Sequence, residues 1–173
     1  MNEPFENKIF IKDTKIKRAL ISVTDKKGID VLAKELITLN IEILSTGGTA
    51  RFLHEYGIPV KDVSEETRFP EILNGRVKTL HPNIHGGILG RRNNSNHINE
   101  MEKHNIIGID LLITNLYKFK ETIQKTNDEC EIIENIDIGG PAMIRAGAKN
   151  HEFISVITDI DDYPELLSQL KHS

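Results

Sequence analysis

The stretch Asn74–Pro82, which reads NGRVKTLHP, brings together side chains that can bind an anion. Arg76 and Lys78 place a guanidinium and an ammonium two residues apart, directly after Gly75. Because alternate side chains of an extended segment point the same way, we expect both cations to face one side. Like charges repel, so a folded protein keeps two cations together mainly to meet an anion. The alternative is a solvated basic strand edge without a specific function.

A glycine-rich turn, which reads STGGT, connects an expected strand to an expected helix. Its two glycines let the backbone approach a ligand closely, and the free N–H groups at the helix start, together with the hydroxyls, suit a phosphate. The spacing is neither that of a Walker A loop nor that of GxGxxG. The alternative is a tight turn with a threonine N-cap. The candidate phosphate ligands of this turn are Ser45, Thr46, Gly47, Gly48 and Thr49.

The histidines and the cysteine favour neither a metal site nor a nucleophile. His81 and His85 are four residues apart, but Pro82 between them argues against a helix, and neither an HExxH motif nor a cysteine pair accompanies them. We therefore expect no metal. The single cysteine, Cys130, lies in an acidic segment, where the surrounding charge disfavours the thiolate.

Three further residues carry groups suited to proton transfer or binding. Asp137 precedes two glycines and a proline, a position where a helix cap is a strong alternative. Tyr117 closes an expected strand and is equally suited to the core. Lys149 shares a helical face with Arg145, and a solvated face is the alternative for that pair.

Composition narrows the class of protein. The chain has 173 residues, which suits one domain, and its 38% apolar and 28% charged residues are ordinary for a globular protein. A net charge of -4 argues against general nucleic-acid binding, and no apolar run approaches the roughly 20 residues that span a bilayer. A single cysteine fits a reducing cytosol, so we expect a cytoplasmic protein. We interpret residues 1–16 as an N-terminal extension and 17–173 as the domain.

The apolar pattern predicts an α/β domain with a mostly parallel sheet between layers of helices. The pattern predicts strands at 18–23, 41–44, 60–63, 109–116 and 153–158, and helices at 29–39, 50–56, 97–105, 141–149 and 161–170. The stretch 64–92 lacks a clear period and suggests a functional loop with short helical pieces.

Several polar segments follow directly after expected strands. Thr24, Asp25 and Lys26 follow the first strand, and Thr114 and Asn115 belong to the end of the strand at 109–116. Ligands bind outside the carboxyl ends of the strands in open parallel sheets. We therefore expect these segments, the glycine-rich turn and the turn at residue 137 to converge on one edge.

Taken together, the motifs closely resemble a known family. They are SVTDK at 22–26, STGGTA at 45–50, FPE at 69–71, GRVKTLHP at 75–82, HGGIL at 85–89, NLY at 115–117, IDIGGP at 136–141 and AKNH at 148–151. The family is the bifunctional purine-biosynthesis enzyme that combines AICAR transformylase and IMP cyclohydrolase, and the resemblance is to its N-terminal domain, over residues 17–163. This resemblance implies the methylglyoxal-synthase-like (MGS-like) fold.

The resemblance also implies an activity: ring closure of 5-formamidoimidazole-4-carboxamide ribotide (FAICAR) to IMP with loss of water and without a cofactor. It implies the catalytic residues Lys78, Tyr117, Asp137 and Lys149. The substrate-binding residues that it implies are Ser22, Thr24, Asp25, Lys26, Ser45, Thr46, Gly47, Gly48, Thr49, Arg76, Val77, Thr79, Thr114, Asn115, Ile136 and Gly139. A homodimer is implied too. The transformylase domain of the family is not part of this sequence, so we expect that activity to lie elsewhere.

The chemistry gives these residues distinct roles. The carboxamide nitrogen must attack the formyl carbon, lose a proton and allow hydroxide to leave. Lys78 suits the developing oxyanion, Asp137 and Lys149 suit the amide and its proton, and Tyr117 suits orientation of the substrate. One departure from the family is Lys118, where the family usually has proline.

Two alternatives stay open. A methylglyoxal synthase-like lyase shares the fold, but its chemistry relies on aspartates acting on a triose phosphate and fits the lysines here poorly. A non-catalytic nucleotide-sensing module of the same fold would bind IMP without converting FAICAR.

Overall fold

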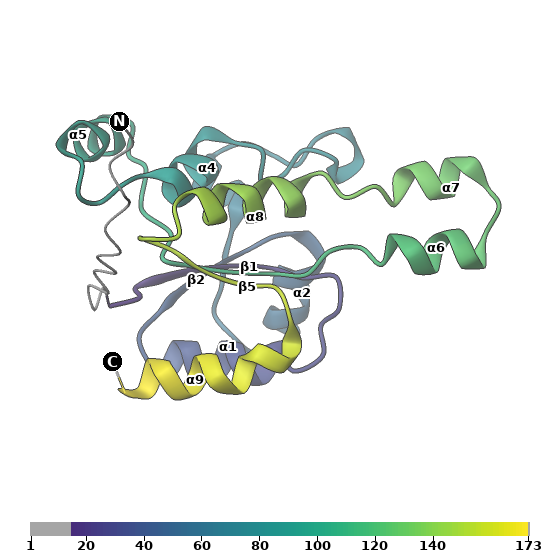
Figure 1. Ribbon diagram of the computed structural model, residues 1–173, viewed down its shortest axis with the longest axis horizontal. Helices are drawn as coiled ribbons and strands as arrows, with labels where there is room; N and C mark the ends of the chain where they lie inside the picture. The colour runs from purple at the N-terminus through teal and green to yellow at the C-terminus, as the bar shows by residue number, and fades with distance from the viewer. Residues whose placement is uncertain (1–14, 173) are drawn as a thin grey trace, which may run out of the picture.

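A five-stranded parallel sheet forms the centre of the computed structural model, which describes residues 15–172 (Figure 1). The expected extension at 1–16 therefore lies, apart from its last two residues, outside the described part of the chain. The strand order is β3-β2-β1-β4-β5, and every pairing between these strands is parallel. The strands are β1 (Arg18–Ser22), β2 (Glu42–Ser45), β3 (Lys61–Asp62), β4 (Leu111–Thr114) and β5 (Ser155–Ile157). The α/β class predicted from the apolar pattern is confirmed.

Helices cover both faces of the sheet (Figure 1). One face carries α1 (Ile29–Thr38), α2 (Gly47–Glu55) and α9 (Tyr163–His172), and the other carries α4 (Pro82–Leu89) and α8 (Gly139–Lys149). The remaining helices are α3 (Val63–Thr67), η1 (Leu73–Gly75), α5 (Ser95–Lys103), α6 (Phe119–Lys125), α7 (Glu129–Glu134) and η2 (Ile160–Asp162).

The alternation of side chains along β1 divides the core into two halves. Ala19 and Ile21 belong to the cluster that includes α1 and α9, whereas Leu20 belongs to the cluster that includes α4 and α8. All three are fully buried, because β1 is the middle strand and has a helical layer on each side. This rigid double-sided core holds the carboxyl ends of the strands in fixed positions.

The segment at 64–92 contains short helical pieces, as expected: α3, η1 and α4. However, α4 begins at Pro82, so the prediction that Pro82 argues against a helix was wrong. Proline is tolerated at the first helical position because its missing N–H would have no partner there. His81 is the N-cap, and its Nδ1 accepts a hydrogen bond from the Asn83 N–H at 3.2 Å. Pro141, expected at the first position of its helix, lies at the third position of α8.

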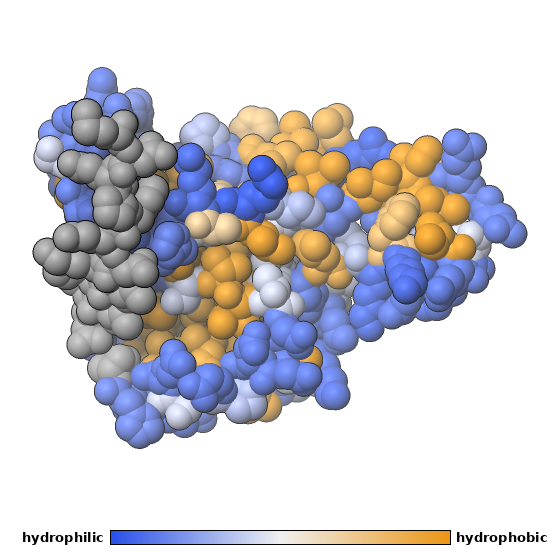
Figure 2. Space-filling view, in the orientation of Figure 1, coloured by the Kyte–Doolittle hydropathy of each residue, from blue (hydrophilic) through white to orange (hydrophobic). Residues whose placement is uncertain are grey.

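The helices α6 and α7 form an arm that projects from the carboxyl edge of the sheet (Figure 1). Apolar side chains are exposed along it, and Figure 2 shows them as a hydrophobic surface. They include Phe119, Ile123, Ile133 and Ile136. Among residues 15–172, no helix has the length and apolar character needed to cross a bilayer, and no group of three metal-ligating side chains occurs.

Candidate functional site

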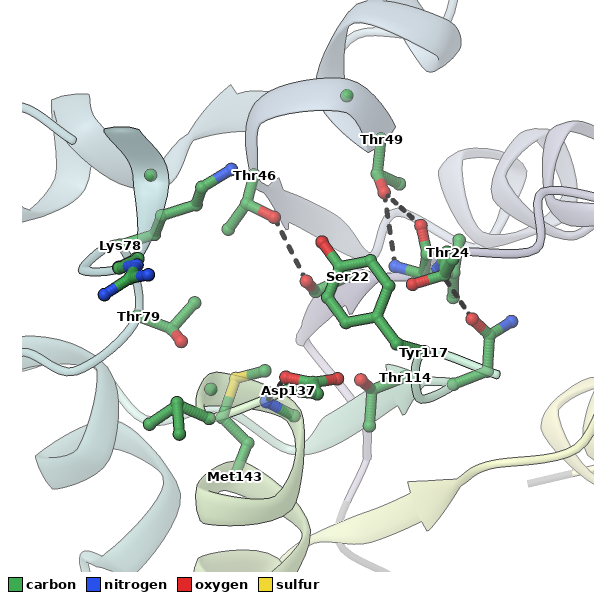
Figure 3. A pocket seen from close by; sticks show the side chains of 18 of the residues that line it. Ser22, Thr24, Thr46, Thr49, Lys78, Thr79, Thr114, Tyr117, Asp137 and Met143 are labelled. Atoms are coloured by element: carbon green, nitrogen blue, oxygen red, sulfur yellow. Dashed lines mark hydrogen bonds between the residues drawn. The ribbon is translucent and has the colours of Figure 1, made fainter. Parts of the chain in front are cut away.

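A cavity of about 490 Å³ opens at the carboxyl ends of β1 and β4, beside the start of α2 (Figure 3). The start of α8 and the end of α7 complete its walls. The predicted site residues that line it are Ser22, Thr24, Lys26, Thr46, Gly48, Thr49, Arg76, Lys78, Thr79, Thr114, Asn115, Tyr117, Ile136, Asp137 and Gly139. The fold thus brings together segments that are more than a hundred residues apart in the sequence.

The start of α2 presents unpaired backbone donors. Thr46 is at the N-cap position, but its hydroxyl pairs with the Ser22 hydroxyl at 3.1 Å and makes no capping hydrogen bond (Figure 3). Within the described residues, the N–H groups of Gly47 and Gly48 donate no hydrogen bond. These N–H groups and the helix dipole favour an anion here.

Hydroxyls and a carboxamide hold this edge together. The Thr49 hydroxyl donates to the Val23 carbonyl at 2.9 Å and accepts from the Val23 N–H at 3.2 Å. Asn115 reaches from the end of β4 to the loop after β1: its Oδ1 accepts from the N–H groups of Thr24 and Asp25, and its Nδ2 donates to the Asp25 carbonyl at 2.9 Å. Both side chains therefore fix the backbone around the cavity.

Three cations surround the start of α2. A Cβ built on Gly47 would lie 2.9 Å from the Lys78 Nζ, and a Cβ on Gly48 would lie 4.0 Å from the Lys26 Nζ and 3.9 Å from the Arg51 guanidinium. Figure 3 shows Lys78 extending toward Thr46. Arg51 was missed by sequence reasoning, although its position three residues after Gly48 on one helix puts the two on the same face.

The basic stretch is not extended as predicted. Leu73 and Asn74 have positive φ, and Arg76 has helical angles (φ −64°, ψ −26°). This turn nevertheless directs Arg76 and Lys78 to the same cavity, so the expected convergence of the two cations occurs by a different backbone path. The Lys78 Nζ lies 3.3 Å from a carboxylate oxygen of Glu71.

Arg76 forms an ion pair with Glu134 at the end of α7, across the mouth of the cavity. The Arg76 Nε donates to the Glu134 Oε1 at 3.2 Å. The hydrogen bond to the guanidinium lowers the pKa of Glu134, and the hydrogen bond to the carboxylate raises the pKa of Arg76. Both side chains are more than half exposed, so water screens the pair, which connects the arm to the turn at 73–76 without contributing much stability.

Asp137 lies opposite the start of α2, at the start of α8 (Figure 3). Its Oδ1 accepts a hydrogen bond from the Gly140 N–H at 2.9 Å, so the capping interaction considered from the sequence is present. Thr79 and Thr114, both nearly buried, line the same end of the cavity with Met143. This end offers a fixed carboxylate and two hydroxyls beside an apolar wall, which suits a heterocycle with amide groups.

Tyr117 is about half exposed and lines the cavity together with Ser22 (Figure 3). It follows the end of β4 by three residues and does not pack in the core, which answers the question left open by the sequence. The phenol is therefore accessible to a ligand in the cavity.

The cavity does not include every predicted residue. Ser45 is buried and its hydroxyl donates to the Ile21 carbonyl, a link between β1 and β2, and Val77 pairs through its backbone with Ile72. Asp25 lines a neighbouring cavity with Lys118. Gly47 does not line the cavity but contacts Lys78.

Lys149 departs most from expectation. It is exposed at the end of α8, ten residues after Gly139, a distance of about 15 Å along the helix axis. It does not line the cavity. A single copy of the chain therefore gives no geometric support to its predicted catalytic role, which stays a prediction.

Other lining residues were not predicted. They are Val23, Asn74, Gly75, Ile133, Glu134, Ile138, Gly140 and Met143. Several of them are sequence neighbours of predicted residues, and this adjacency is the only signal in the sequence that could have indicated them. Ile133 and Glu134 come from the arm, and no sequence pattern indicated that the arm folds back to the cavity.

An all-parallel sheet with a polar cavity at its carboxyl edge is the arrangement of an open α/β ligand-binding domain. The family model described as "MGS-like domain" matches residues 28–142. The chain belongs to the MGS-like domain family. It is 55% identical over 156 residues to the "Bifunctional purine biosynthesis protein PurH" of Roseobacter denitrificans, covering 90% of this chain and 30% of that protein. The protein of the same name from Anoxybacillus flavithermus is 54% identical, with the same coverage.

A solved structure is similar as well. The structure titled "Crystal structure of ForH" superposes with a TM-score of 0.82 at 37% sequence identity, covering 90% of this chain and 79% of that chain. The chain spans about 30% of the length of the curated relatives it matches, and the likeness to PurH proteins predicted from the motifs is confirmed over that part.

Proposed function

We propose that this domain is an IMP cyclohydrolase, which closes FAICAR to IMP with release of water. The observation that carries the proposal is one cavity with an anion site at the start of α2 and a carboxylate, Asp137, at the other end. A nucleoside monophosphate has matching ends, a phosphate and a base with amide groups. The names of the similar PurH proteins support the same proposal.

The phosphate is proposed to bind the N–H groups of Gly47 and Gly48. Lys26 and Arg51 supply positive charge beside them, so the anion meets both free N–H groups and cations. A structure with bound IMP tests this placement, because a phosphate more than a few ångströms from those N–H groups would contradict it.

The reaction is proposed to occur beside Asp137. The carboxamide nitrogen attacks the formyl carbon and loses one proton. The formamide nitrogen then loses its proton as the C=N bond forms and the C–O bond breaks, so the former formyl oxygen leaves as water with these two protons. Asp137 is positioned to accept the proton, and Tyr117 to orient the substrate. In this structure the Lys78 Nζ lies at the start of α2, so its side chain must turn toward Asp137 to stabilise the oxyanion.

The deciding experiment is a spectrophotometric assay of FAICAR cyclisation by this polypeptide. We expect turnover without any added metal or cofactor. Binding of IMP without turnover would favour the nucleotide-sensing module, and turnover of dihydroxyacetone phosphate would favour the methylglyoxal synthase-like lyase.

A substitution at Gly47 tests the anion end. Gly47 has φ +40° and a Cβ there would displace Lys78, whereas Gly57 has φ +69° and open space around it. Both changes to alanine carry a similar backbone strain of about 1–2 kcal/mol. We expect Gly47→Ala to lower IMP affinity and cyclisation about tenfold to a hundredfold, because the misplaced groups no longer fit the phosphate. Calorimetric titration with IMP should show no such loss for Gly57→Ala.

We also propose that the domain forms a homodimer in the cytoplasm and works beside a transformylase domain, as the resemblance implies. Sedimentation equilibrium should detect dimers at high micromolar concentrations of this polypeptide. A monomer alone at those concentrations would contradict the prediction for the isolated domain.

A further inference from the structure

Glu71 lies beside the anion end of the cavity, next to Gly47, although it is not one of the residues that line the cavity. A Cβ on Gly47 would lie 3.2 Å from the Glu71 Oε1 and 3.8 Å from its Oε2, so the carboxylate lies directly over the first residue of α2. This is the place where the free N–H groups and the cations favour an anion. Sequence reasoning placed Glu71 only within a family motif and gave it no role.

Glu71 is also the ion-pair partner of Lys78. The Lys78 Nζ lies 3.3 Å from the Glu71 Oε2, and both side chains are one-third exposed. The end of Lys78 passes between two glycines: a Cβ on Gly75 would lie 2.7 Å from the Lys78 Cε, and a Cβ on Gly47 would lie 2.9 Å from the Nζ. The two glycines, both with positive φ, leave the space in which Lys78 meets Glu71.

The charged side chains around the start of α2 have a net positive charge, which favours binding of a phosphate there. Lys26, Arg51 and Lys78 are positive and Glu71 is negative, so the cluster carries a net charge of about +2, close to the size of the charge on a phosphate monoester. A phosphate over Gly47 and Gly48 would nevertheless lie against the Glu71 carboxylate, and like charges so close repel strongly. Phosphate and the Glu71 carboxylate therefore compete for one place.

We propose that Glu71 is an internal counterion which the phosphate of the ligand replaces, and that this exchange releases Lys78 from its ion pair. The proposal rests on the proposed function for the location of the phosphate. Glu71 acts as a positioning residue, because its ion pair with Lys78 holds the Lys78 ammonium at the start of α2. Once the phosphate takes that place, Lys78 is free to turn toward the reacting groups near Asp137.

The test is equilibrium binding of phosphate-bearing ligands to Glu71→Gln, which keeps the shape of the side chain and removes its charge. We expect the affinity for ribose 5-phosphate and for IMP to rise about tenfold, because the competing carboxylate is gone. The affinity for inosine, which has no phosphate, should stay unchanged. Calorimetry at constant ionic strength measures all three, and thermal melts verify that each variant is folded.

Two further variants test whether the negative charge of Glu71 itself lowers the phosphate affinity. Glu71→Asp keeps the charge and should return phosphate affinity toward that of the wild type. Glu65→Gln removes a carboxylate from α3, in the same region of the chain but outside the cavity, and should leave phosphate affinity unchanged. Unchanged or weaker phosphate binding by Glu71→Gln would overturn the proposal, as would an equal gain for inosine.

The binding test of Glu71→Gln does not depend on turnover, because calorimetry measures ligand affinity without the cyclisation reaction. If the wild type cyclises FAICAR but Glu71→Gln gains no phosphate affinity, only the exchange fails. If neither the wild type nor Glu71→Gln binds IMP, both the exchange and the proposed function fail. A gain in phosphate affinity without FAICAR turnover in the wild type would support the exchange alone.

Discussion

Replacing Lys78 with alanine is expected to lower the turnover of FAICAR about 10²- to 10³-fold, the cost of losing one group that stabilises an oxyanion. Lys78 lines the same cavity as Asp137, and its Nζ lies beside Gly47 at the start of α2. The side chain is one-third exposed and contributes little packing, so the midpoint of thermal unfolding should stay close to that of the wild type. Steady-state kinetics beside a thermal melt measures both effects.

The matched control is Lys27→Ala. Lys27 is exposed in the loop after β1 and lies outside the cavity, so this variant removes one positive charge from the same edge without touching the site. We expect near-normal turnover from it. Near-normal turnover from Lys78→Ala as well would contradict the proposed role and favour the solvated basic edge considered from the sequence.

Replacing Asp137 with asparagine is expected to lower turnover about 10²- to 10⁴-fold, because the variant loses the group proposed to accept the amide proton. The choice of asparagine is deliberate. The Asp137 Oδ1 accepts a hydrogen bond from the Gly140 N–H, and an asparagine oxygen can accept the same bond, so the start of α8 is kept. A loss of turnover in this variant is therefore caused by the missing proton acceptor and not by a disturbed fold.

Asp137→Ala provides the comparison. It removes both the carboxylate and the capping interaction, so we expect the same loss of turnover together with a loss of about 1 kcal/mol in the free energy of unfolding. Denaturant titrations of the two variants separate these contributions. If Asp137→Asn keeps more than a tenth of the wild-type turnover, Asp137 acts as a helix cap only.

The fold could be predicted largely from the sequence because its signals are local. The apolar run that begins at Arg18 and the helical spacing from Ile29 onward are patterns of neighbouring residues, and both elements occur within a residue or two of the expected bounds. Pro82 misled the prediction for the opposite reason. A proline is tolerated in the first turn of a helix but breaks a helix in its interior, so only the position of the helix start decided that Pro82 is tolerated.

The candidate site could be predicted in part. Polar residues after parallel strands converge on one edge, and this rule correctly placed Thr24, Thr114 and part of the glycine-rich turn beside one cavity. It could not place Lys149, since a residue ten positions along a helix from the cavity wall lies a full helix length away from it. The resemblance supplied that residue without any geometry.

The sequence by itself determined which residue types are available: a glycine-rich turn at a strand exit, cations near residue 76 and a carboxylate before α8. Tertiary structure alone decided how they meet. Glu71 lies over Gly47 only because the chain after α3 returns to the start of α2, and Glu134 reaches Arg76 only because the arm folds back. The physical reason is that charges act through space, so a residue 24 positions away in sequence can be the counterion that a ligand must replace.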